Sequence, residues 1–361
     1  PKGSLIQATD GFFYGMASQG GNNSAGTIFK ISSTGVYTIL HHFVSATGGS
    51  NPQGSLIQGP DGYLYGMTKS GGTNAVGTIF KISTAGVFTV IRHLSSTTDG
   101  GNPEGSLIKG LDSNFYGMTY FNARIFKISP SGVFTVLKTL NGTPDGLTPT
   151  GSLVLGKDGN FYGACSQGGS FGRGTIFKMT PTGVYTVIKH LNPTVDGGYP
   201  AGSLVQAADG NFYGLTSAGG TYNAGTIFKI SGTGVYAVIR HLDLLKDGGA
   251  PFGSLIIQKV PVLIANPQTI TATEDVLKPI VLTGSGATPL TYTVVTPPKN
   301  GTVTAGTLPN RTYTPKANYW GKDSFYFTVN VNCFSSPPAK VLITVTAVNN
   351  DAPVLHSIRS K

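Results

Sequence analysis

Acidic side chains and cysteines are scarce in this sequence. Its 361 residues include two Glu and two Cys, and charged residues of both signs make up 11% of the chain. Two thiols, Cys165 and Cys333, cannot build a disulfide framework, and we expect both to be small buried side chains. Glu104 and Glu274 fall in different predicted domains, so a pair of glutamates for glycoside hydrolysis is missing.

Two further absences exclude classes of protein. No apolar run approaches the roughly 18 residues that a membrane helix needs, and no signal peptide opens the chain. The net charge is +10, but the basic residues are dispersed along the chain, which argues against a nucleic-acid footprint.

Glycine is abundant and recurs in a fixed order. The chain holds 52 Gly and 22 Pro, yet 39% of its residues are apolar, which is typical of a folded β-rich protein. A repeat of about 50 residues cannot bury its apolar face alone and must stack on its neighbours. Pro1-Lys2 matches the Pro-Gln, Pro-Glu and Pro-Thr pairs that precede later copies, so the sequence starts inside a repeat loop. We therefore expect a leader or earlier repeats to have been removed. The copies open with Gly-Ser-Leu at Gly3, Gly54, Gly105, Gly151, Gly202 and Gly253.

One repeat predicts four β-strands. In the fifth copy they fall at 202–206, 211–217, 225–231 and 235–242, each rich in β-branched and aromatic residues and bounded by Gly, Asp or Asn. Four antiparallel strands per repeat, without a helical period, match a propeller blade. We therefore predict an all-β fold with a five-bladed β-propeller over residues 1–258. The sixth Gly-Ser-Leu is either a spare strand or helps to close the ring.

Polar side chains that recur in every copy are expected to hold this scaffold. The Asp of each first turn caps the turn through its carboxylate, and these residues are Asp10, Asp61, Asp112, Asp158 and Asp209. The recurring lysines are expected to be solvated strand ends, and these are Lys30, Lys81, Lys127, Lys178 and Lys229. Four histidines share one repeat position, and these are His42, His93, His190 and His241. Separate blades place them far apart, whereas zinc holds its ligands at about 2 Å, so they cannot share a metal.

The repeat resembles a known family. The phrases Asp-Gly-Asn-Phe-Tyr-Gly, Gly-Thr-Ile-Phe-Lys-Ile and Val-Tyr-Thr-Val, with a Gly-Gly loop between the first two, are similar to the GloVer-type (Gloeobacter and Verrucomicrobia) tandem repeat of bacterial surface-anchored proteins. The resemblance covers residues 1–258 in five copies. It implies export and a propeller-like fold, and it transfers no functional residue.

A second domain follows a linker at 259–265. Residues 266–353 alternate short strands with turns, as an immunoglobulin-like β-sandwich requires. The run Tyr313-Thr-Pro-Lys-Ala-Asn-Tyr-Trp-Gly-Lys-Asp-Ser-Phe resembles the cadherin-like modules of bacterial adhesins. Residues 354–361 are then a tail or the start of the next linker.

The expectation of a calcium site comes from the cadherin resemblance alone. Related linkers bind Ca²⁺, and Glu274, Asp275 and Asp351 are the candidate ligands, with Asp323 the other acidic residue of the module. A calcium site needs about six to eight oxygens, so this acidic supply is small. We expect no other cofactor.

Functional residues are expected where the repeat departs from its own pattern. The third copy lacks five residues in the loop between its second and third strands. The same loop in other copies, and the loops between copies, are rich in glycine and contain aromatic residues. Aromatic rings with Asn and Arg donors are typical of sugar- or peptide-binding surfaces, although the rings could equally cover the seams between blades. The predicted ligand site consists of Tyr120, Phe121, Asn122, Arg124, Phe171, Arg173 and Tyr199.

These observations favour a non-enzymatic, secreted bacterial surface protein that binds a carbohydrate or a cell-surface protein. The alternative is a self-associating subunit of an extracellular filament or coat, assembled by β-strand addition. A glycoside-acting enzyme is the least favoured hypothesis, because the recurring Asp residues are engaged in turns and the sequence contains no phosphate loop.

Overall fold

A computed structural model describes residues 2–256, 262–331 and 334–348. The chain divides into two compact units, Pro1–Ile257 and Gln258–Lys361. Both units are built from β-strands, and the only helices among the described residues are the single turns α1 (Ser45–Gly48) and α2 (Gly142–Asp145). None of the helices that the structure describes is long and apolar enough to cross a membrane.

Each repeat of the first unit forms one four-stranded antiparallel sheet, as predicted. The first sheet contains β1 (Ile6–Gln7), β2 (Phe13–Ala17), β3 (Thr27–Ile31) and β4 (Tyr37–His42). The second contains β5 (Ile57–Gln58), β6 (Leu64–Thr68), β7 (Thr78–Ile82) and β8 (Phe88–His93). The third contains β9 (Ile108–Lys109), β10 (Phe115–Thr119), β11 (Arg124–Ile128) and β12 (Phe134–Thr139). The fourth contains β13 (Leu147–Leu155), β14 (Phe161–Gln167), β15 (Thr175–Met179) and β16 (Tyr185–His190). The fifth contains β17 (Gly198–Gln206), β18 (Phe212–Ala218), β19 (Thr226–Ile230) and β20 (Tyr236–His241).

Aromatic side chains fill the seams between neighbouring sheets. The sequence predicts that a Tyr and the residue before it point to opposite sides of the second strand and that one of the two sets lines the seams. Both sets do: Tyr65 packs against Phe115 of the next sheet with ring centroids 4.2 Å apart, and Tyr116 packs against Phe161 in the same way at 4.1 Å. Every inner seam therefore joins the Tyr face of one sheet to the Phe face of the next.

The Gly-Ser-Leu segments make the closest contacts between sheets. The backbone N–H of Ser4 donates to Ser55 Oγ at 2.8 Å, and the same bond recurs at each later junction, ending with Ser203 N–H to Ser254 Oγ. A Cβ atom on Gly54 would collide with the backbone of Gly105, so glycine is required for this approach.

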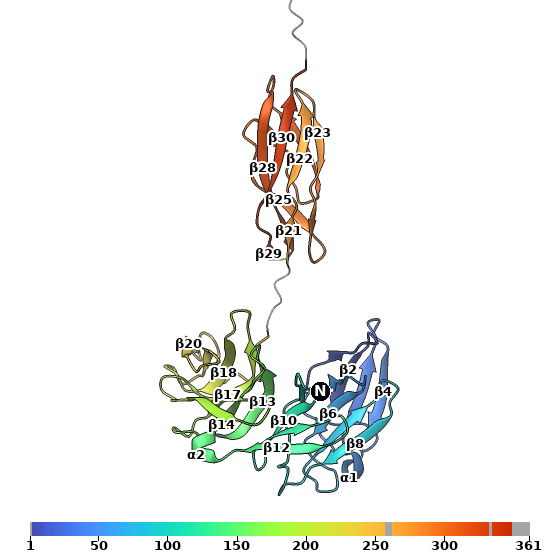
Figure 1. The fold of residues 1–361 in the computed structure, drawn as a ribbon, viewed down its shortest axis with the longest axis vertical. Coiled ribbons are helices and arrows are strands. Elements are labelled where there is room, and N and C mark those ends of the chain that lie inside the picture. The colour runs from blue at the N-terminus through green and yellow to red at the C-terminus, as the bar shows by residue number, and fades with distance from the viewer. Residues whose placement is uncertain (1, 257–261, 332–333, 349–361) are drawn as a thin grey trace, which may run out of the picture. The chain divides into compact units, whose positions relative to one another are not determined.

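The five sheets lie side by side in chain order, and the sheets of β2 and β18 are the two ends of the series (Figure 1). Four hydrophobic clusters join them, one for each seam between consecutive sheets. No such cluster of the described residues joins the fifth sheet to the first. A Cβ atom on Gly253 would meet nothing within 4 Å, so Gly253 makes no close approach of the kind that Gly54 makes to Gly105.

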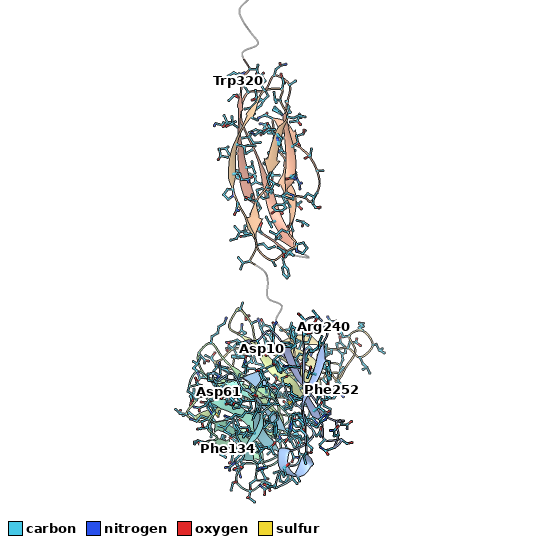
Figure 2. The ribbon with its side chains drawn as sticks, turned by 90° about the vertical axis from the view of Figure 1, so that its right-hand side faces the viewer. Asp10, Asp61, Phe134, Arg240, Phe252 and Trp320 are labelled. Carbon is cyan, nitrogen blue, oxygen red and sulfur yellow. The ribbon has the colours of Figure 1, made fainter. Side chains whose placement is uncertain are left out.

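The second unit is a β-sandwich. One layer has the strand order β22 (Gln268–Thr273), β30 (Ala339–Thr346), β28 (Gly321–Val331) and β25 (Thr291–Thr296), with β29 (Phe334–Ser335) paired to β28. The other contains β23 (Lys278–Val281), β27 (Asn310–Pro315) and β26 (Gly301–Val303), and β21 (Ile264–Ala265) pairs with β24 (Gly284–Ser285). Tyr313, Phe325, Phe327, Val341 and Ile343 fill the core. Trp320, which the cadherin-like motif contains, is 68% exposed (Figure 2).

Candidate functional site

The shortened loop of the third repeat is held by its own polar side chains. Arg124, the first residue of β11, donates from Nη1 to Thr139 Oγ1 at 2.6 Å and from Nη2 to the carbonyl of Thr97 at 2.9 Å. Asn122 Nδ2 donates to the carbonyl of Ser96 at 2.9 Å. Two of the predicted ligand-binding residues therefore also fasten this loop to the preceding loop between sheets.

The other repeats fasten the same loop with histidine. His93 Nδ1 accepts the backbone N–H of Thr73 at 3.2 Å, and His42, His190 and His241 make the same bond in their own sheets. Thr139 occupies this position in the third repeat, where Arg124 replaces the missing contact. These histidines thus have a structural role in separate sheets, and the part of the chain that the structure describes contains no cluster of three metal-ligating side chains.

A hollow of about 450 Å³ opens beside this loop. Tyr120, Asn122 and Arg124 line it from the loop, and Thr139 and Leu147 line it from the end of β12 and the start of β13. Tyr120 is 44% exposed, so its ring is available to a ligand. The hollow combines one aromatic face with hydrogen-bonding amide, hydroxyl and guanidinium groups.

A second hollow of about 510 Å³ lies at the next seam. Arg173 lies over the ring of Tyr199, with its Cζ 4.9 Å from the ring centroid, and both residues line the hollow together with Asn223 and Thr194. The backbone N–H of Tyr199 donates to the carbonyl of Arg173 at 2.8 Å, which positions the pair. This arrangement offers a guanidinium with an aromatic platform.

The seven predicted ligand-binding residues do not form a single site. Tyr120, Asn122 and Arg124 share one hollow, whereas Arg173 and Tyr199 share the other. Phe121 lines neither hollow; its backbone pairs with Gly101, and its side chain is 49% exposed. Phe171 also lines neither hollow and is 52% exposed. The sequence could not predict this division, because it depends on how the loops of neighbouring sheets meet.

A recurring ion pair was missed in the sequence. Asp99 is 2% exposed and accepts hydrogen bonds from Arg92, Thr98 and the backbone N–H of Ser95. Burial opposes the ionisation of Asp99, but these hydrogen bonds outweigh it and lower its pKa. The pairs are Arg92–Asp99, Lys138–Asp145, Lys189–Asp196 and Arg240–Asp247. Their signal is a basic residue followed seven residues later by Asp.

The first repeat lacks both members of this ion pair. His41 stands in the basic position and Gly48 in the acidic one, and the imidazole stacks on Phe88 with ring centroids 3.8 Å apart. Burial, and then the neighbouring His42, lower the pKa of His41, which favours its neutral form. The paired replacement avoids leaving one charge without a partner.

The turn aspartates have the structural role that the sequence predicts. Asp158 Oδ1 accepts the backbone N–H of Asn160 at 3.2 Å, and its Oδ2 accepts the hydroxyl of Tyr162 at 2.8 Å. The Tyr hydroxyl to Asp bond occurs in all five repeats. Lys178 approaches Asp158 to 3.1 Å and Lys81 approaches Asp61 to 3.9 Å, so these two recurring lysines pair with the turn as well.

The candidate calcium ligands also hold the backbone. Glu274 Oε2 accepts the N–H of Val348, and Asp275 Oδ1 accepts the N–H of Asn318, each at 3.0 Å. Asp323 is 6% exposed and accepts the hydroxyl of Tyr313 at 2.9 Å. Asp351 lies outside the described residues, as does Cys333. Cys165 is buried in the fourth sheet, and this burial raises the pKa of its thiol to about 12.

Comparison with family models identifies both units. A model of the Gloeobacter/Verrucomicrobia repeat matches residues 1–124 and 122–266, and a model of the bacterial Ig domain matches residues 258–344. Since the repeat matches span more than half of the sequence, the chain belongs to the Gloeobacter/Verrucomicrobia repeat family. The resemblance noted in the sequence is therefore confirmed. A search of curated proteins found none that matches the chain.

Solved structures similar to this chain include enzymes. A catalytically inactive virginiamycin B lyase from Staphylococcus aureus with quinupristin is 15% identical with a TM-score of 0.51, and 91% of each chain is covered. A streptogramin B lyase is 17% identical with a TM-score of 0.49, covering 91% of this chain and 92% of that one. A gluconolactonase from Xanthomonas campestris is 10% identical with a TM-score of 0.38, covering 70% and 90%. At such identities the virginiamycin B lyase likeness supports a propeller-like fold and nothing about activity.

Proposed function

We propose that this member of the Gloeobacter/Verrucomicrobia repeat family is a non-enzymatic, extracellular surface protein that binds carbohydrate. The five sheets are the blades of a propeller-type scaffold, and the loops between them carry the ligand site. The observation that supports the proposal is the hollow lined by Tyr120, Asn122 and Arg124. The bacterial Ig domain that follows the repeats is consistent with a role at a cell surface.

Carbohydrate is the ligand class that this hollow fits. The exposed ring of Tyr120 offers an apolar face on which a sugar ring can stack, and Asn122 keeps its amide oxygen available because its Nδ2 donates to Ser96. The two terminal nitrogens of Arg124 donate hydrogen bonds to Thr139 and Thr97. These bonds fix the position of the guanidinium, whose positive charge lies at the hollow. A neutral or acidic glycan would satisfy these groups, with the second hollow of Arg173 and Tyr199 as an additional contact.

Several contacts support a binding protein over a glycosidase. Every acidic side chain of the described residues accepts a hydrogen bond, and Glu104 pairs with Lys69 at 2.7 Å. A retaining or inverting glycosidase needs two carboxyl groups about 5–9.5 Å apart that face the substrate. The turn aspartates accept hydrogen bonds from Tyr hydroxyls, and the loop aspartates pair with Arg or Lys. These carboxylates therefore stabilise the fold and do not face a substrate as a catalytic pair.

A glycan array with the wild type and the Tyr120→Ala variant tests the proposal. Loss of one aromatic stacking contact removes about 0.5–1.5 kcal/mol, so we expect binding to weaken by about two- to twelvefold. Tyr222→Ala is the matched control, because Tyr222 is 57% exposed on the equivalent loop of the fifth repeat and lines neither hollow. Equal loss in both variants would point away from the third-repeat hollow, and no binding to any glycan would remove the carbohydrate proposal.

The second candidate function is a self-associating subunit of an extracellular filament or coat. It is favoured by the segment Gly253–Ile256, which follows the fifth sheet, has an exposed Ile256 and lies in none of the strands or bridges of the described residues. Such a segment can add to the sheet of another molecule. Sedimentation of the wild type over a range of concentrations tests this candidate, since a filament subunit would form species larger than a dimer.

A further inference from the structure

Arg173 differs from the other arginines that the structure describes, because its guanidinium donates no hydrogen bond to another described residue. In the other four the guanidinium donates to a carboxylate, a hydroxyl or a backbone carbonyl, and these are Arg92, Arg124, Arg240 and Arg311. The Arg173 side chain is exposed and lies over the ring of Tyr199. This contact holds the cation at the second hollow and leaves its N–H donors unused.

The scaffold does not require the side chains of Arg173 and Tyr199. The backbone bond from Tyr199 N–H to the carbonyl of Arg173 recurs at three other junctions between smaller residues, and these pairs are Asn51–Ala25, Asn102–Val76 and Ala250–Ala224. The backbone of Arg173 also bridges to Gly168, just as that of Val76 bridges to Gly71. The local fold therefore forms equally well without the guanidinium and without the phenol ring.

Tyr199 is also an unfavourable residue for its backbone. Its φ is +55°, in the left-handed region, where Asn51 and Asn102 have φ values of +56° and +53°. Asparagine tolerates this region, whereas a bulky side chain is uncommon there. Strained residues of this kind cluster at ligand sites, so Tyr199 has the character of a binding residue.

The hollow of about 510 Å³ beside this pair contains further polar groups. Asn223 Oδ1 accepts the backbone N–H of Gly219 at 3.1 Å, which leaves the Asn223 Nδ2 as a donor at the hollow. The hydroxyl of Thr194 donates to Asn192 Oδ1 at 2.8 Å, so its oxygen is left to accept a hydrogen bond. Together these groups can bind the hydroxyls of a sugar.

The charge at this hollow is positive. Arg173 is the only charged residue among those that line it. Asp196, two residues before Gly198 of the lining, is buried and pairs with Lys189 at 2.8 Å, so its negative charge is compensated. An anionic ligand therefore meets one cation and no unpaired carboxylate of the lining.

We propose that this hollow binds the carboxylate of an acidic sugar and that Arg173 recognises its charge. A guanidinium presents two parallel N–H donors to the two oxygens of a carboxylate, and Arg173 has these donors free. The volume lies within the range of small-molecule sites. This inference rests on the carbohydrate proposal and adds the class of sugar and the residue that selects it.

Titration calorimetry with matched probes tests the recognition of charge. The probes are trisaccharides of galacturonic acid and of mannuronic acid, each compared with its own methyl ester, which keeps the sugar rings and removes the charge. We expect the wild type to bind at least one acid about fivefold or more tighter than its ester. A wild type that binds neither acid, or both acids no tighter than their esters, would overturn the proposal.

Two substitutions assign the preference to the hollow. Arg173→Val and Tyr199→Asn install the residues that the chain has at Val76 and Asn102. Arg173→Val should abolish the preference for acid over ester and shift the melting temperature by no more than about 2 °C. Tyr199→Asn should weaken acid binding and leave the melting temperature unchanged or higher, since asparagine suits the left-handed backbone.

Lys246→Ala is the control for general attraction to a basic protein. Lys246 has a side chain that is 76% exposed, and it lines neither hollow. The variant loses one positive charge, as Arg173→Val does, and should keep the preference for acid. Equal losses in the two variants would overturn Arg173 as the selecting residue, and so would a melting temperature of Arg173→Val that falls together with binding.

Two further outcomes separate this inference from the carbohydrate proposal. Neutral glycans that bind through Tyr120, with acids and esters bound equally, would retain the carbohydrate proposal and overturn this one. An array on which no glycan binds would remove both. A sulfated galactose that binds tighter than both uronic acids would overturn the carboxylate as the recognised group, because a sulfate ester offers Arg173 the same negative charge.

Discussion

At the scale of single residues, side chains that recur in every repeat are explained by hydrogen bonds within the repeat. The carboxylate of each turn Asp accepts a backbone N–H two residues later and a Tyr hydroxyl four residues later. Burial, followed by the hydrogen bond that the Tyr162 hydroxyl donates to Asp158, raises the pKa of Tyr162 above its usual value. These bonds are local, so they form in every repeat whatever its neighbours are.

The stability of the first unit should depend on pH through Asp158, the turn aspartate of the fourth repeat. Partial burial of Asp158 opposes its ionisation, but hydrogen bonds from Asn160, Tyr162 and Lys178 outweigh this and lower its pKa to about 2. In the unfolded chain the same carboxyl takes up a proton near pH 3.9. The unfolded state therefore binds more protons between these values, so this contribution is complete above about pH 4 and is lost as the pH falls towards 2.

We expect the Asp158→Asn variant to show a smaller fall in melting temperature than the wild type between pH 4 and pH 2. Asparagine does not titrate, so the variant lacks this source of acid sensitivity. Thermal unfolding followed by circular dichroism at several pH values measures the difference. Parallel curves for the two proteins would contradict the low pKa of Asp158 in the folded state.

At the scale of elements, the seams between sheets supply the main stabilisation of the first unit. Tyr162 of the fourth sheet stacks on Phe212 of the fifth with ring centroids 3.9 Å apart, and Phe80 and Phe43 meet across the first seam at 5.4 Å. Each sheet contributes a different set of aromatic side chains to its two seams. A sheet at the end of the series consequently leaves one set without a partner.

Because a sheet at the end of the series has one uncovered face, truncating the same Phe should destabilise an inner sheet more than the first sheet. Phe115 is fully buried against Tyr65, so Phe115→Ala should lower the free energy of unfolding by about 3–5 kcal/mol. Phe13 occupies the same position in the first sheet but is only partly buried, so Phe13→Ala should cost clearly less. Urea unfolding of the two variants measures both values, and equal losses would argue against an uncovered face on the first sheet.

At the scale of the whole molecule, the chain contains two units with separate cores. The sandwich core is formed entirely by residues of the second unit, among them Tyr313 and Phe325. The seam clusters of the first unit include no residue of the sandwich. Each unit therefore has the buried apolar surface of an independent folding domain.

We expect calorimetry of the intact chain to show two unfolding transitions. Phe325→Ala removes a fully buried ring from the sandwich and should lower one transition only, whereas Phe115→Ala should lower the other. The two variants serve as controls for each other. A single transition that shifts with either substitution would show that the two units unfold as one.

The sequence by itself determined the features that depend on local chemistry. The spacing of Gly-Ser-Leu and the Asp turns predicted one four-stranded sheet per repeat, and alternating strands predicted the sandwich, because strand period and turn residues act over a few neighbours. The structural role of the recurring Asp residues was predictable for the same reason. The basic residue with Asp seven positions later was also present in the sequence but was recognised only in the structure.

Tertiary structure decided the features that depend on how sheets meet. The Tyr face of one sheet meets the Phe face of the next, and the loops divide the predicted ligand residues between two hollows. Arg124 reaches the carbonyl of Thr97 in the preceding loop, a contact that no spacing rule indicates. The unpaired faces at the two ends of the series likewise show only in the folded molecule. They depend on which sheets meet, and those meetings are contacts between residues far apart in the sequence.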